Sequence, residues 1–530
     1  QNVRQLEPMG FIKFDLLGLT TLRMIQGCIE RILKKQGNAN PSFQEVKAFY
    51  NKHLHPSNLD LDDQNVYENV FHQGKWAGIF QFTESGAQNF CKSVKPRNIV
   101  DISAITSIFR PGPLSAGVHE DYVRAKEAPH EVWYENDIVK QVTGETYGFL
   151  IFQEQIALLA HKLGKNISLD EGNLLRKLLT KKGTGKGAEL KYDIRDRFVA
   201  GCTDKGMRRK DALEMWQNFE YFSGYGFNKS HAVCYSIISY QCAWLMSYYE
   251  GEWLAAYLDK VSDKKKESAI ATAKTLGYTI SKLNVNISGK QWEYDESTNS
   301  LLQPLTTIKG LGDAAMEQVV NNRPFHTVED FLFHPDVTYS KLNKKALDVL
   351  VRAGACDHLK DDRFTGMKHF WSAVVVDRPK NKKKFGENIE LYKAEGDFSR
   401  DELISQKSDL TGIFPFDLVM SDSVRVKLEQ LPVVPISEYE VAMSVESSED
   451  DQLLVWFVPR KLLKKKTTRG KEYWILKVVD SNNAMVDIKC WNPSENDTIY
   501  VNQPYMAKLD YSEQWGFSTR SIRRNFRLLG

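Results

Sequence analysis

The hydrophobic pattern changes character along this chain, and that change limits what the chain can fold into. Residues 41–260 are mostly helical in pattern and dense in basic and aromatic side chains. Residues 430–530 instead alternate short apolar runs with turn residues, which is the pattern of β-strands. A chain of 530 residues is also too long for a single core. We therefore predict a multidomain α+β protein with three or more domains.

The remaining segments have patterns of their own. Residues 1–40 predict a strand followed by a helix over Thr20–Lys35. A small α/β segment is expected to end near residue 305, and residues 306–358 predict two short helical hairpins. The polar, lysine-rich stretch Arg378–Glu402 predicts a loop or linker.

Charge, cysteines and hydropathy exclude several classes of protein. The net charge is only +3, so any binding of nucleic acid must come from local basic patches. The seven cysteines form no C-x-x-C pair, which argues against zinc ribbons and fits a reducing cytosol. The uncharged run Ser230–Tyr249 is long enough to span a bilayer, but its Ser and Gln residues predict a buried core helix. We expect a cytoplasmic protein.

An acidic and a basic residue share one face of the first predicted strand. Alternation places Lys13 and Asp15 on the same side of the run F-I-K-F-D-L, with apolar side chains on the other side. Metal-assisted phosphoryl transfer uses a carboxylate for Mg²⁺ and a cation for phosphates, although one carboxylate cannot hold two metal ions. The alternative is a structural ion pair.

Two further segments present cations. In the run F-R-P-G-P-L, two prolines around a glycine fix a rigid turn that can present Arg110. In the run R-K-L-L-T-K-K, Arg176 and Lys177 are followed by Lys181 and Lys182, and Lys177 and Lys181 are i,i+4 neighbours on a helix. Like charges at this spacing destabilise a bare helix, and an anion between them would reverse the effect. The alternative is a solvated basic face.

The run F-S-G-Y-G-F-N-K-S-H-A at residues 222–232 predicts a glycine-rich loop before a helix. Asn228 or Ser230 can cap that helix, and Lys229 and His231 add a cation and an imidazole at its start. This combination suits contact with a phosphate or a base, although a lysine and a histidine at a helix start can also be purely structural.

The run T-I-K-G-L-G-D is a helix-hairpin-helix signature that includes Lys309, Gly310 and Gly312. Its glycines let backbone amides approach a phosphate, so such hairpins bind DNA without reading its sequence. Residues 341–357 predict a second hairpin of the pair. The alternative is a generic helix-turn-helix packing unit.

A basic hairpin with tryptophans nearby marks the β region. Lys464, Lys465 and Lys466 precede a turn, and Trp474 opens the apolar run that follows. Charge and stacking aromatics suit binding of single-stranded nucleic acid, although some of the aromatic side chains must belong to the core.

Several of these runs resemble the bacterial or phage DNA polymerase III alpha subunit, the C-family replicative polymerase. The resemblance rests on four runs: F-Q-F-T-E-S-G at 80–86, F-R-P-G-P-L at 109–114, T-Y-G-F-L-I-F-Q-E-Q at 146–155 and F-S-G-Y-G-F-N-K-S-H at 222–231. Arg176-Lys177 stands where the family has two arginines, and lysine lacks the bidentate fork. The resemblance begins at the family's third catalytic aspartate, which matches Asp15.

The resemblance implies a domain order. Residues 1–40 would be the end of a nucleotidyltransferase-type palm, and residues 41–260 the large, mostly helical fingers. Residues 261–410 would be a tandem helix-hairpin-helix domain that binds duplex DNA, and residues 430–530 an OB-fold β-barrel.

The resemblance also implies template-directed addition of deoxynucleotides to a primer 3′-end. Asp15 would be a catalytic, Mg²⁺-binding residue that works with carboxylates of an upstream palm and thumb segment, so the chain as given would be incomplete. The incoming nucleotide would be held by Lys13, Arg110, Arg176, Lys177, Lys181 and Lys182. The remaining site residues would contact DNA: Asn228, Lys229, Ser230, His231, Lys309, Gly310, Gly312, Lys464, Lys465, Lys466 and Trp474.

Two points stay open at this stage. A sliding clamp is a possible partner, but we find no clear clamp-binding peptide after the hairpins. The alternative function is that of a non-catalytic, DNA-binding polymerase remnant, and the retention of Lys13 and Asp15 speaks against it.

Overall fold

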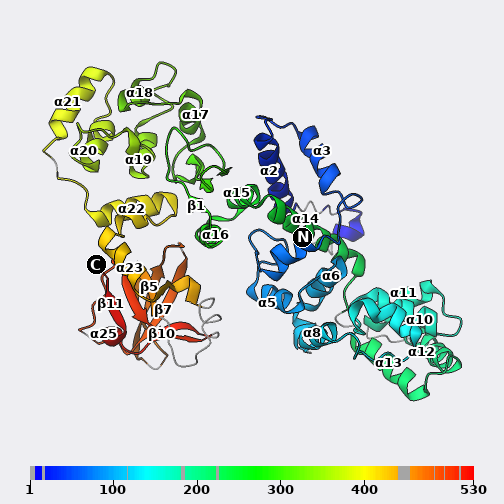
Figure 1. Cartoon of the computed structure of the whole chain (residues 1–530). Helices are drawn as coiled ribbons and strands as arrows, with labels where there is room; N and C mark the ends of the chain where they lie inside the picture. The colour runs from blue at the N-terminus through cyan, green and yellow to red at the C-terminus, as the bar shows by residue number, and fades with distance from the viewer. Residues whose placement is uncertain are drawn as a thin grey trace. The chain divides into compact units, whose positions relative to one another are not determined.

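The chain is described here by a computed structural model that divides into two compact units, Gln1–Trp253 and Leu254–Gly530 (Figure 1). The described residues are 6–12, 14, 18–115, 117–180, 186–222, 226–394, 396–439, 454–468, 470–482, 484–494, 496–512 and 515–529. The first unit is helical, and the second combines helices with two sheets, which confirms the predicted multidomain α+β class.

The first unit is built from helices of very different lengths. They are η1 (Glu7–Met9), α2 (Thr20–Lys35), α3 (Phe43–His53), α4 (Gln64–Val66), η2 (Tyr67–His72), α5 (Ser85–Val94), α6 (Ile99–Ile108), α7 (Pro111–Ser115), α8 (Val118–Glu127), α9 (Asp137–Thr143), η3 (Gly144–Thr146), α10 (Gln153–Leu163), α11 (Leu169–Thr180), α12 (Lys186–Asp204), α13 (Arg209–Phe222) and α14 (Lys229–Tyr248). Helix α15 (Glu250–Lys260) crosses the division between the units.

Helix α14 is the buried core helix that the uncharged run predicted. Two of its polar side chains are satisfied by distant backbone carbonyls: the Ser239 hydroxyl donates to Phe80 O at 2.8 Å, and the Gln241 amide donates to Leu54 O at 2.7 Å. These two bonds offset most of the desolvation penalty of burying α14, although the buried Ser236 hydroxyl of the same helix has no hydrogen-bond partner among the described residues.

The start of the chain differs from its prediction. Helix α2 is found over the predicted residues, but Phe11, Ile12 and Phe14 lie outside any helix or strand and are exposed. A strand needs a neighbour for its backbone hydrogen bonds, and the described part of the first unit contains no strand that could pair with this run. Lys13 and Asp15 lie outside the described residues.

The second unit begins with a small sheet and a set of short helices. These are α16 (Asp263–Thr275), β1 (Thr279–Ile280), β2 (Glu293–Asp295), β3 (Ser300–Leu302), η4 (Leu305–Thr307), α17 (Asp313–Asn322), α18 (Val328–Phe333), α19 (Lys344–Arg352), η5 (Asp357–Leu359), α20 (Met367–Trp371), η6 (Ser372–Val376), α21 (Lys382–Tyr392), α22 (Arg400–Thr411), η7 (Phe416–Leu418) and α23 (Asp422–Gln430). Strand β3 pairs with β1 in parallel and with β2 in antiparallel fashion.

The predicted loop over Arg378–Glu402 is wrong, because helix α21 and the start of α22 occupy it. Asn381 caps the first helix through a hydrogen bond to Lys384 N, and Ser399 forms a capping box with Glu402. Phe385 packs into the core of the hairpin domain, so a few apolar side chains suffice to fix a lysine-rich helix.

The last part of the chain is a β-barrel. Its elements are β4 (Val433–Pro435), η8 (Ile436–Glu438), β5 (Leu454–Lys466), β6 (Glu472–Val479), β7 (Met485–Trp491), β8 (Tyr505–Lys508), β9 (Asp510–Ser512), β10 (Gly516–Thr519), α25 (Ile522–Asn525) and β11 (Phe526–Leu528). The strand order is β11-β8-β5-β6-β7-β10-β9, with β7 and β10 parallel and β4 paired with β5 off this path.

Only Leu509 separates β8 from β9, so one bent stretch of chain pairs with β5 at one end and with β10 at the other. The five resulting strands form the closed ring of an OB-fold, as predicted.

Candidate functional site

Two of the sequence motifs are joined by backbone hydrogen bonds in the first unit. Phe227 N donates to Ile151 O at 3.1 Å, and Gln153 N donates to Phe227 O at 2.8 Å. The Gln153 side chain adds a bond to Gly226 O at 2.8 Å. These contacts hold the start of α10 against the start of α14, although the two starts lie far apart in the sequence.

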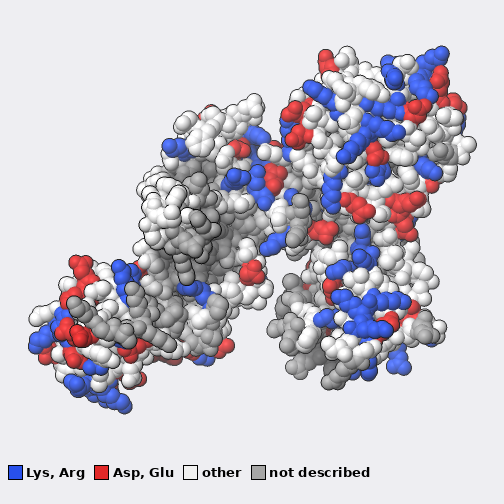
Figure 2. All heavy atoms as spheres, turned by 180° about the vertical axis from the view of Figure 1, so that it is seen from behind, with Lys and Arg blue, Asp and Glu red and all other residues white. Residues whose placement is uncertain are grey.

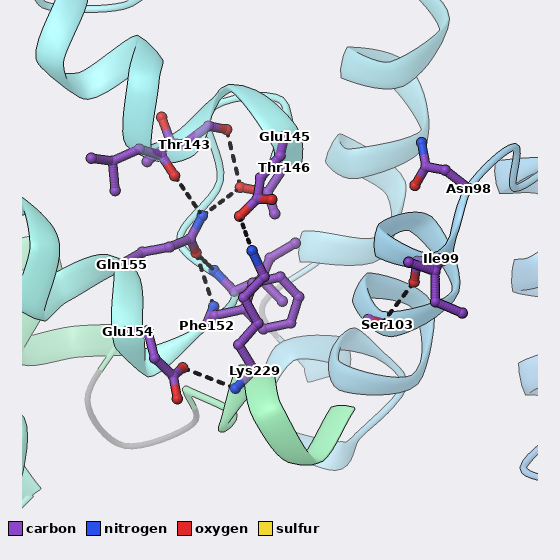
Figure 3. A network of polar contacts seen from close by, with 12 residues as sticks. Asn98, Ile99, Ser103, Thr143, Glu145, Thr146, Phe152, Glu154, Gln155 and Lys229 are labelled. Carbon is purple, nitrogen blue, oxygen red and sulfur yellow. Dashed lines mark hydrogen bonds and ion pairs between the residues drawn. The ribbon is translucent and has the colours of Figure 1, made fainter. Parts of the chain in front are cut away.

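At this junction a carboxylate collects donors from two further segments. The Asn228 amide donates to Glu154 Oε1 and Lys229 N donates to Glu154 Oε2, both at 2.9 Å. Arg176 Nη1, from α11, lies 3.5 Å from Glu154 Oε1. Figure 3 shows Glu154 turned toward the backbone of Lys229. We call Glu154, Arg176, Asn228 and Lys229 the Glu154 cluster; their side chains are partly exposed.

The Lys229 side chain of the Glu154 cluster and the neighbouring Arg110 are also held in place. The Lys229 ammonium donates to Glu145 Oε1 at 2.5 Å and lies 5.5 Å from the centroid of the buried Phe152 ring (Figure 3). The exposed Arg110 guanidinium lies 4.7 Å from the centroid of the Phe227 ring. Cation–π contacts of this kind hold the charge in place without neutralising it.

The other predicted residues of this region are placed as follows. His231 is exposed, and its ring lies 4.2 Å from that of Tyr235 and 5.5 Å from that of Phe227. Asn228 caps α14 through a 2.9 Å bond from His231 N. Ser230 and Lys177 are exposed, on α14 and α11, whereas Lys181 and Lys182 lie outside the described residues.

A buried glutamine fixes the loop that carries Glu145. Gln155 Oε1 accepts bonds from Ile151 N at 2.8 Å and Phe152 N at 2.9 Å. Its amide donates to Thr146 Oγ1 at 2.7 Å and Val142 O at 3.3 Å (Figure 3). Because all four hydrogen-bonding positions of the amide group are used, this loop is held in one arrangement.

A buried ion pair braces the same loop from the other side. Asp101 is 1% exposed, pairs with Lys126, and accepts bonds from Arg97 N at 2.9 Å and Tyr147 OH at 3.4 Å. Burial lowers the pKa of Lys126, and the Asp101 carboxylate opposes that shift. Burial also raises the pKa of Tyr147 to about 12, so its hydroxyl stays a donor at neutral pH.

In the second unit, the two hairpins lie side by side. Gly310 has a φ of +89°, which only glycine adopts without strain, and Gly312 precedes α17. A Cβ on Gly310 would lie 3.7 Å from Val349 and 4.0 Å from Lys345, both on α19. Lys309 and Lys345 are exposed beside this loop, although the Lys309 amide itself donates to Leu410 O.

The burial of Trp474 in the barrel argues against its predicted contact with DNA. Trp474 is 5% exposed and packs in the barrel core, so its ring face cannot stack on a base. Lys464, Lys465 and Lys466 are exposed as expected, with the Lys464 ammonium 5.0 Å from the Trp474 ring centroid. Figure 2 shows Lys and Arg side chains gathered on one face of the second unit.

Other aromatic side chains lie on the outer face of the barrel. Tyr473 and Trp491 are paired across β6 and β7, with ring centroids 5.1 Å apart and ring planes at 27°. Trp515 is 64% exposed, and the Lys489 ammonium lies 5.1 Å from its ring centroid. Tyr473 and Trp491 are partly exposed, and partly or fully exposed rings beside lysines suit single-strand binding by stacking.

Replacing Trp491 by alanine is therefore expected to weaken binding of a short single-stranded DNA about tenfold, since stacking contributes about 1–3 kcal/mol per base. Trp474→Phe keeps an apolar ring in the core and should change the affinity less than twofold. Fluorescence anisotropy of a labelled oligothymidylate measures both. A larger loss of affinity in Trp474→Phe than in Trp491→Ala would show that Trp474 contacts the DNA.

Two family models match parts of this chain. Residues 22–206 match the family described as "Bacterial DNA polymerase III alpha subunit finger domain", and residues 277–366 match "Helix-hairpin-helix motif". The chain is 33% identical over 367 residues to DNA polymerase III subunit alpha of Xylella fastidiosa, covering 68% of this chain and 29% of that protein. It is 31% identical over 393 residues to the Helicobacter pylori protein of that name, covering 72% of this chain and 31% of the relative.

The Chlamydia pneumoniae protein of the same name is 28% identical over 465 residues, covering 83% of this chain and 35% of the relative. This chain belongs to the bacterial DNA polymerase III alpha-subunit family. It spans about a third of the length of these relatives. Within this chain, the finger-domain match contains Arg110, Glu154 and Arg176, and the hairpin match contains Gly310 and Gly312.

The metal site stays a prediction. Among the described residues, no group of three or more His, Cys, Asp or Glu side chains is arranged to hold a metal ion. Asp15, the predicted Mg²⁺ ligand, is not one of those residues. In the same part of the chain, no helix is both long enough and apolar enough to cross a membrane.

Sequence reasoning missed the two carboxylates of this site. Glu154 lies within a quoted motif, and Glu145 lies two residues before Tyr147, but neither was assigned a role. The signal that could have found them is the charge balance: Arg176 and Lys229, if partly buried, need counter-ions, and these two acids lie in the neighbouring motifs.

Proposed function

We propose that this chain supplies the nucleotide-binding and DNA-binding parts of a DNA-directed DNA polymerase. The observation that carries the proposal is the convergence of Arg110, Arg176 and Lys229, from three separate motifs, around one solvent-accessible junction. A negatively charged substrate with several phosphates suits such a site. The reaction is template-directed addition of a deoxynucleotide to a primer 3′-end.

In this proposal the described residues bind and orient, and the chemistry is completed elsewhere. Arg176 and Lys229 hold phosphates of the incoming nucleotide, and Lys13, Lys177, Lys181 and Lys182 add charge. Arg110 and the start of α14, including Ser230 and His231, lie near the base or the primer end. Mg²⁺ held by Asp15 and further carboxylates would neutralise the charge that develops on the transferred phosphate.

The same proposal assigns DNA to the second unit. The paired hairpins, with Lys309 and Lys345 exposed at the loop of Gly310, contact the duplex backbone without reading bases. The outer face of the barrel binds single-stranded DNA through Tyr473, Trp491 and the lysines beside them. Binding of duplex DNA and binding of single-stranded DNA would both take place in the cytoplasm, where the DNA lies.

We also propose that another polypeptide segment completes the active site. Met9, Phe11, Ile12 and Phe14, which precede Asp15 in the sequence, are all exposed, and Phe14 is 80% exposed. A group of exposed apolar side chains usually marks a surface that a partner covers. Two metal ions also need more carboxylates than Asp15 alone. An upstream palm and thumb segment with the remaining aspartates fits both needs.

Primer extension tests this proposal directly. The chain joined to the upstream segment of a relative is expected to extend a primed template, whereas the chain alone is expected to bind the DNA and add no nucleotide. Extension is measured with a labelled primer on a denaturing gel. Synthesis by the chain alone would contradict the need for a partner. DNA binding without synthesis in both forms would favour a non-catalytic remnant.

A further inference from the structure

We infer that Glu154 is a built-in competitor for the phosphates of the nucleotide. In the protein without nucleotide, its carboxylate takes the donors that a phosphate group would take, and binding of the nucleotide exchanges one anion for the other. The inference rests on the proposed function, because it assigns the nucleotide to the Glu154 cluster.

The first reason is the number of donors on one side chain. Asn228 Nδ2 and Lys229 N each donate to Glu154 at 2.9 Å, and Arg176 Nη1 lies 3.5 Å away. A side-chain amide, a main-chain amide and a guanidinium thus converge on two oxygen atoms. Such a convergence is what proteins build to bind an anion.

The second reason is the chemistry of these donors. Lys229 N is at the first position of α14, a helix of 20 residues, where the helix dipole favours a negative charge. Arginine binds carboxylate and phosphate with the same fork of N–H groups. Each donor that now holds Glu154 can therefore be transferred to a phosphate oxygen without a change in its own position.

The third reason is accessibility. The side chains of Glu154, Arg176 and Lys229 are 28%, 24% and 32% exposed, so solvent and a small ligand can reach them. Glu145 balances the Lys229 ammonium in the same way, but it accepts only this one cation in the described contacts. Glu154 is therefore the side chain whose removal frees most of the site.

A purely structural role for Glu154 predicts the opposite result. If Glu154 only positions Arg176 and α14, its loss disorders the donors and weakens nucleotide binding. If Glu154 competes, its loss makes the donors available and strengthens binding. The sign of the change distinguishes a competing carboxylate from a positioning one.

The experiment is calorimetric titration of the full chain with dATP, comparing the wild type with four variants. Glu154→Gln keeps the side-chain volume and removes the charge, and we expect about tenfold tighter binding, because the charge-assisted hydrogen bonds that compete with the phosphate are weakened. Glu154→Asp keeps the charge but shortens its reach, and we expect a gain of about twofold to threefold. Arg176→Ala should weaken binding about tenfold or more.

Glu171→Gln is the matched control on the same helix as Arg176. Glu171 pairs with Arg197 at 2.6 Å, outside the Glu154 cluster, so its neutralisation should leave dATP binding unchanged. A gain there equal to that of Glu154→Gln would show a general effect of net charge and would overturn the inference. The melting temperature of every variant shows whether it is folded. If Glu154→Gln does not fold, the binding affinity of Glu154→Asp decides the question.

The outcomes separate the inference from the proposed function. Wild-type binding that falls with Arg176→Ala, but does not rise with either Glu154 variant, would overturn the competing role and leave the nucleotide site in place. Binding that is unaffected by Arg176→Ala, or absent in every variant, would overturn the nucleotide site itself.

Discussion

Replacing Asp15 by alanine in the completed enzyme is expected to lower primer extension by about a thousandfold or more. The proposed role of this carboxylate is to share metal ions with the upstream acids, and a bound metal ion contributes several kcal/mol of charge stabilisation in the transition state. Binding of the primed template should change less than twofold, because the hairpins and the barrel lie elsewhere in the sequence. Single-turnover extension and anisotropy measure the two quantities.

Asp60→Ala is the control for the loss of an acidic side chain. Asp60 and Asp62 form a D-x-D pattern, two acidic residues separated by one residue. The Asp60 carboxylate accepts a 3.0 Å hydrogen bond from Asp62 N in a turn, which is a structural role. We expect normal extension from this variant. Extension retained by Asp15→Ala would remove Asp15 from the active site, and extension lost by Asp60→Ala would make Asp60 the better candidate.

Replacing Asp101 by alanine is expected to destabilise the first unit by roughly 3–5 kcal/mol, the usual cost of leaving one member of a buried ion pair alone. Lys126 would then keep a charge in a buried place, and Tyr147 and Arg97 N would lose an acceptor. For a unit of this size we expect the melting temperature to fall by about 10 °C. Scanning calorimetry measures the transition.

The matched control is the double variant Asp101→Ala with Lys126→Met. Removing both charges should recover part of the lost stability, because no unpaired ion remains buried. The transition of the second unit should stay where it is in both proteins and serves as an internal reference. A double variant less stable than Asp101→Ala would show that Lys126 stabilises the unit through contacts other than its charge.

The sequence predicted the elements whose local signals are strong. Helix α2, the buried helix α14, the hairpin at Gly310 and the change to β-structure were all expected from periodicity, glycine and capping residues. Helix α21 was missed because lysines dominate its sequence. Its stability comes from an Asn381 cap and from Phe385 in a distant core, and packing of this kind is not visible in a local window.

The candidate site was predicted in part. The motifs named Arg110, Arg176 and Lys229, but their meeting point depends on the pairing of Phe227 with residues 151–153, which local periodicity does not reveal. The prediction that Trp474 contacts DNA conflicts with its burial for a different reason. Neighbouring residues on a strand face opposite sides, and the sequence does not say which side becomes the inside of a barrel.

The pairing at Phe227 has a topological consequence. The chain leaves this point at residue 153 and returns to it at residue 226, so α10 to α13 form an excursion whose two ends are a hydrogen bond apart (Figure 1). Most of the residues in the apolar core around α10 to α13 belong to that excursion. Segments with adjacent ends can be exchanged, lengthened or permuted during evolution while the rest of the fold stays connected. Because Arg176 lies inside the excursion and Lys229 just outside it, such an exchange could alter one half of the phosphate contacts and leave the other half in place.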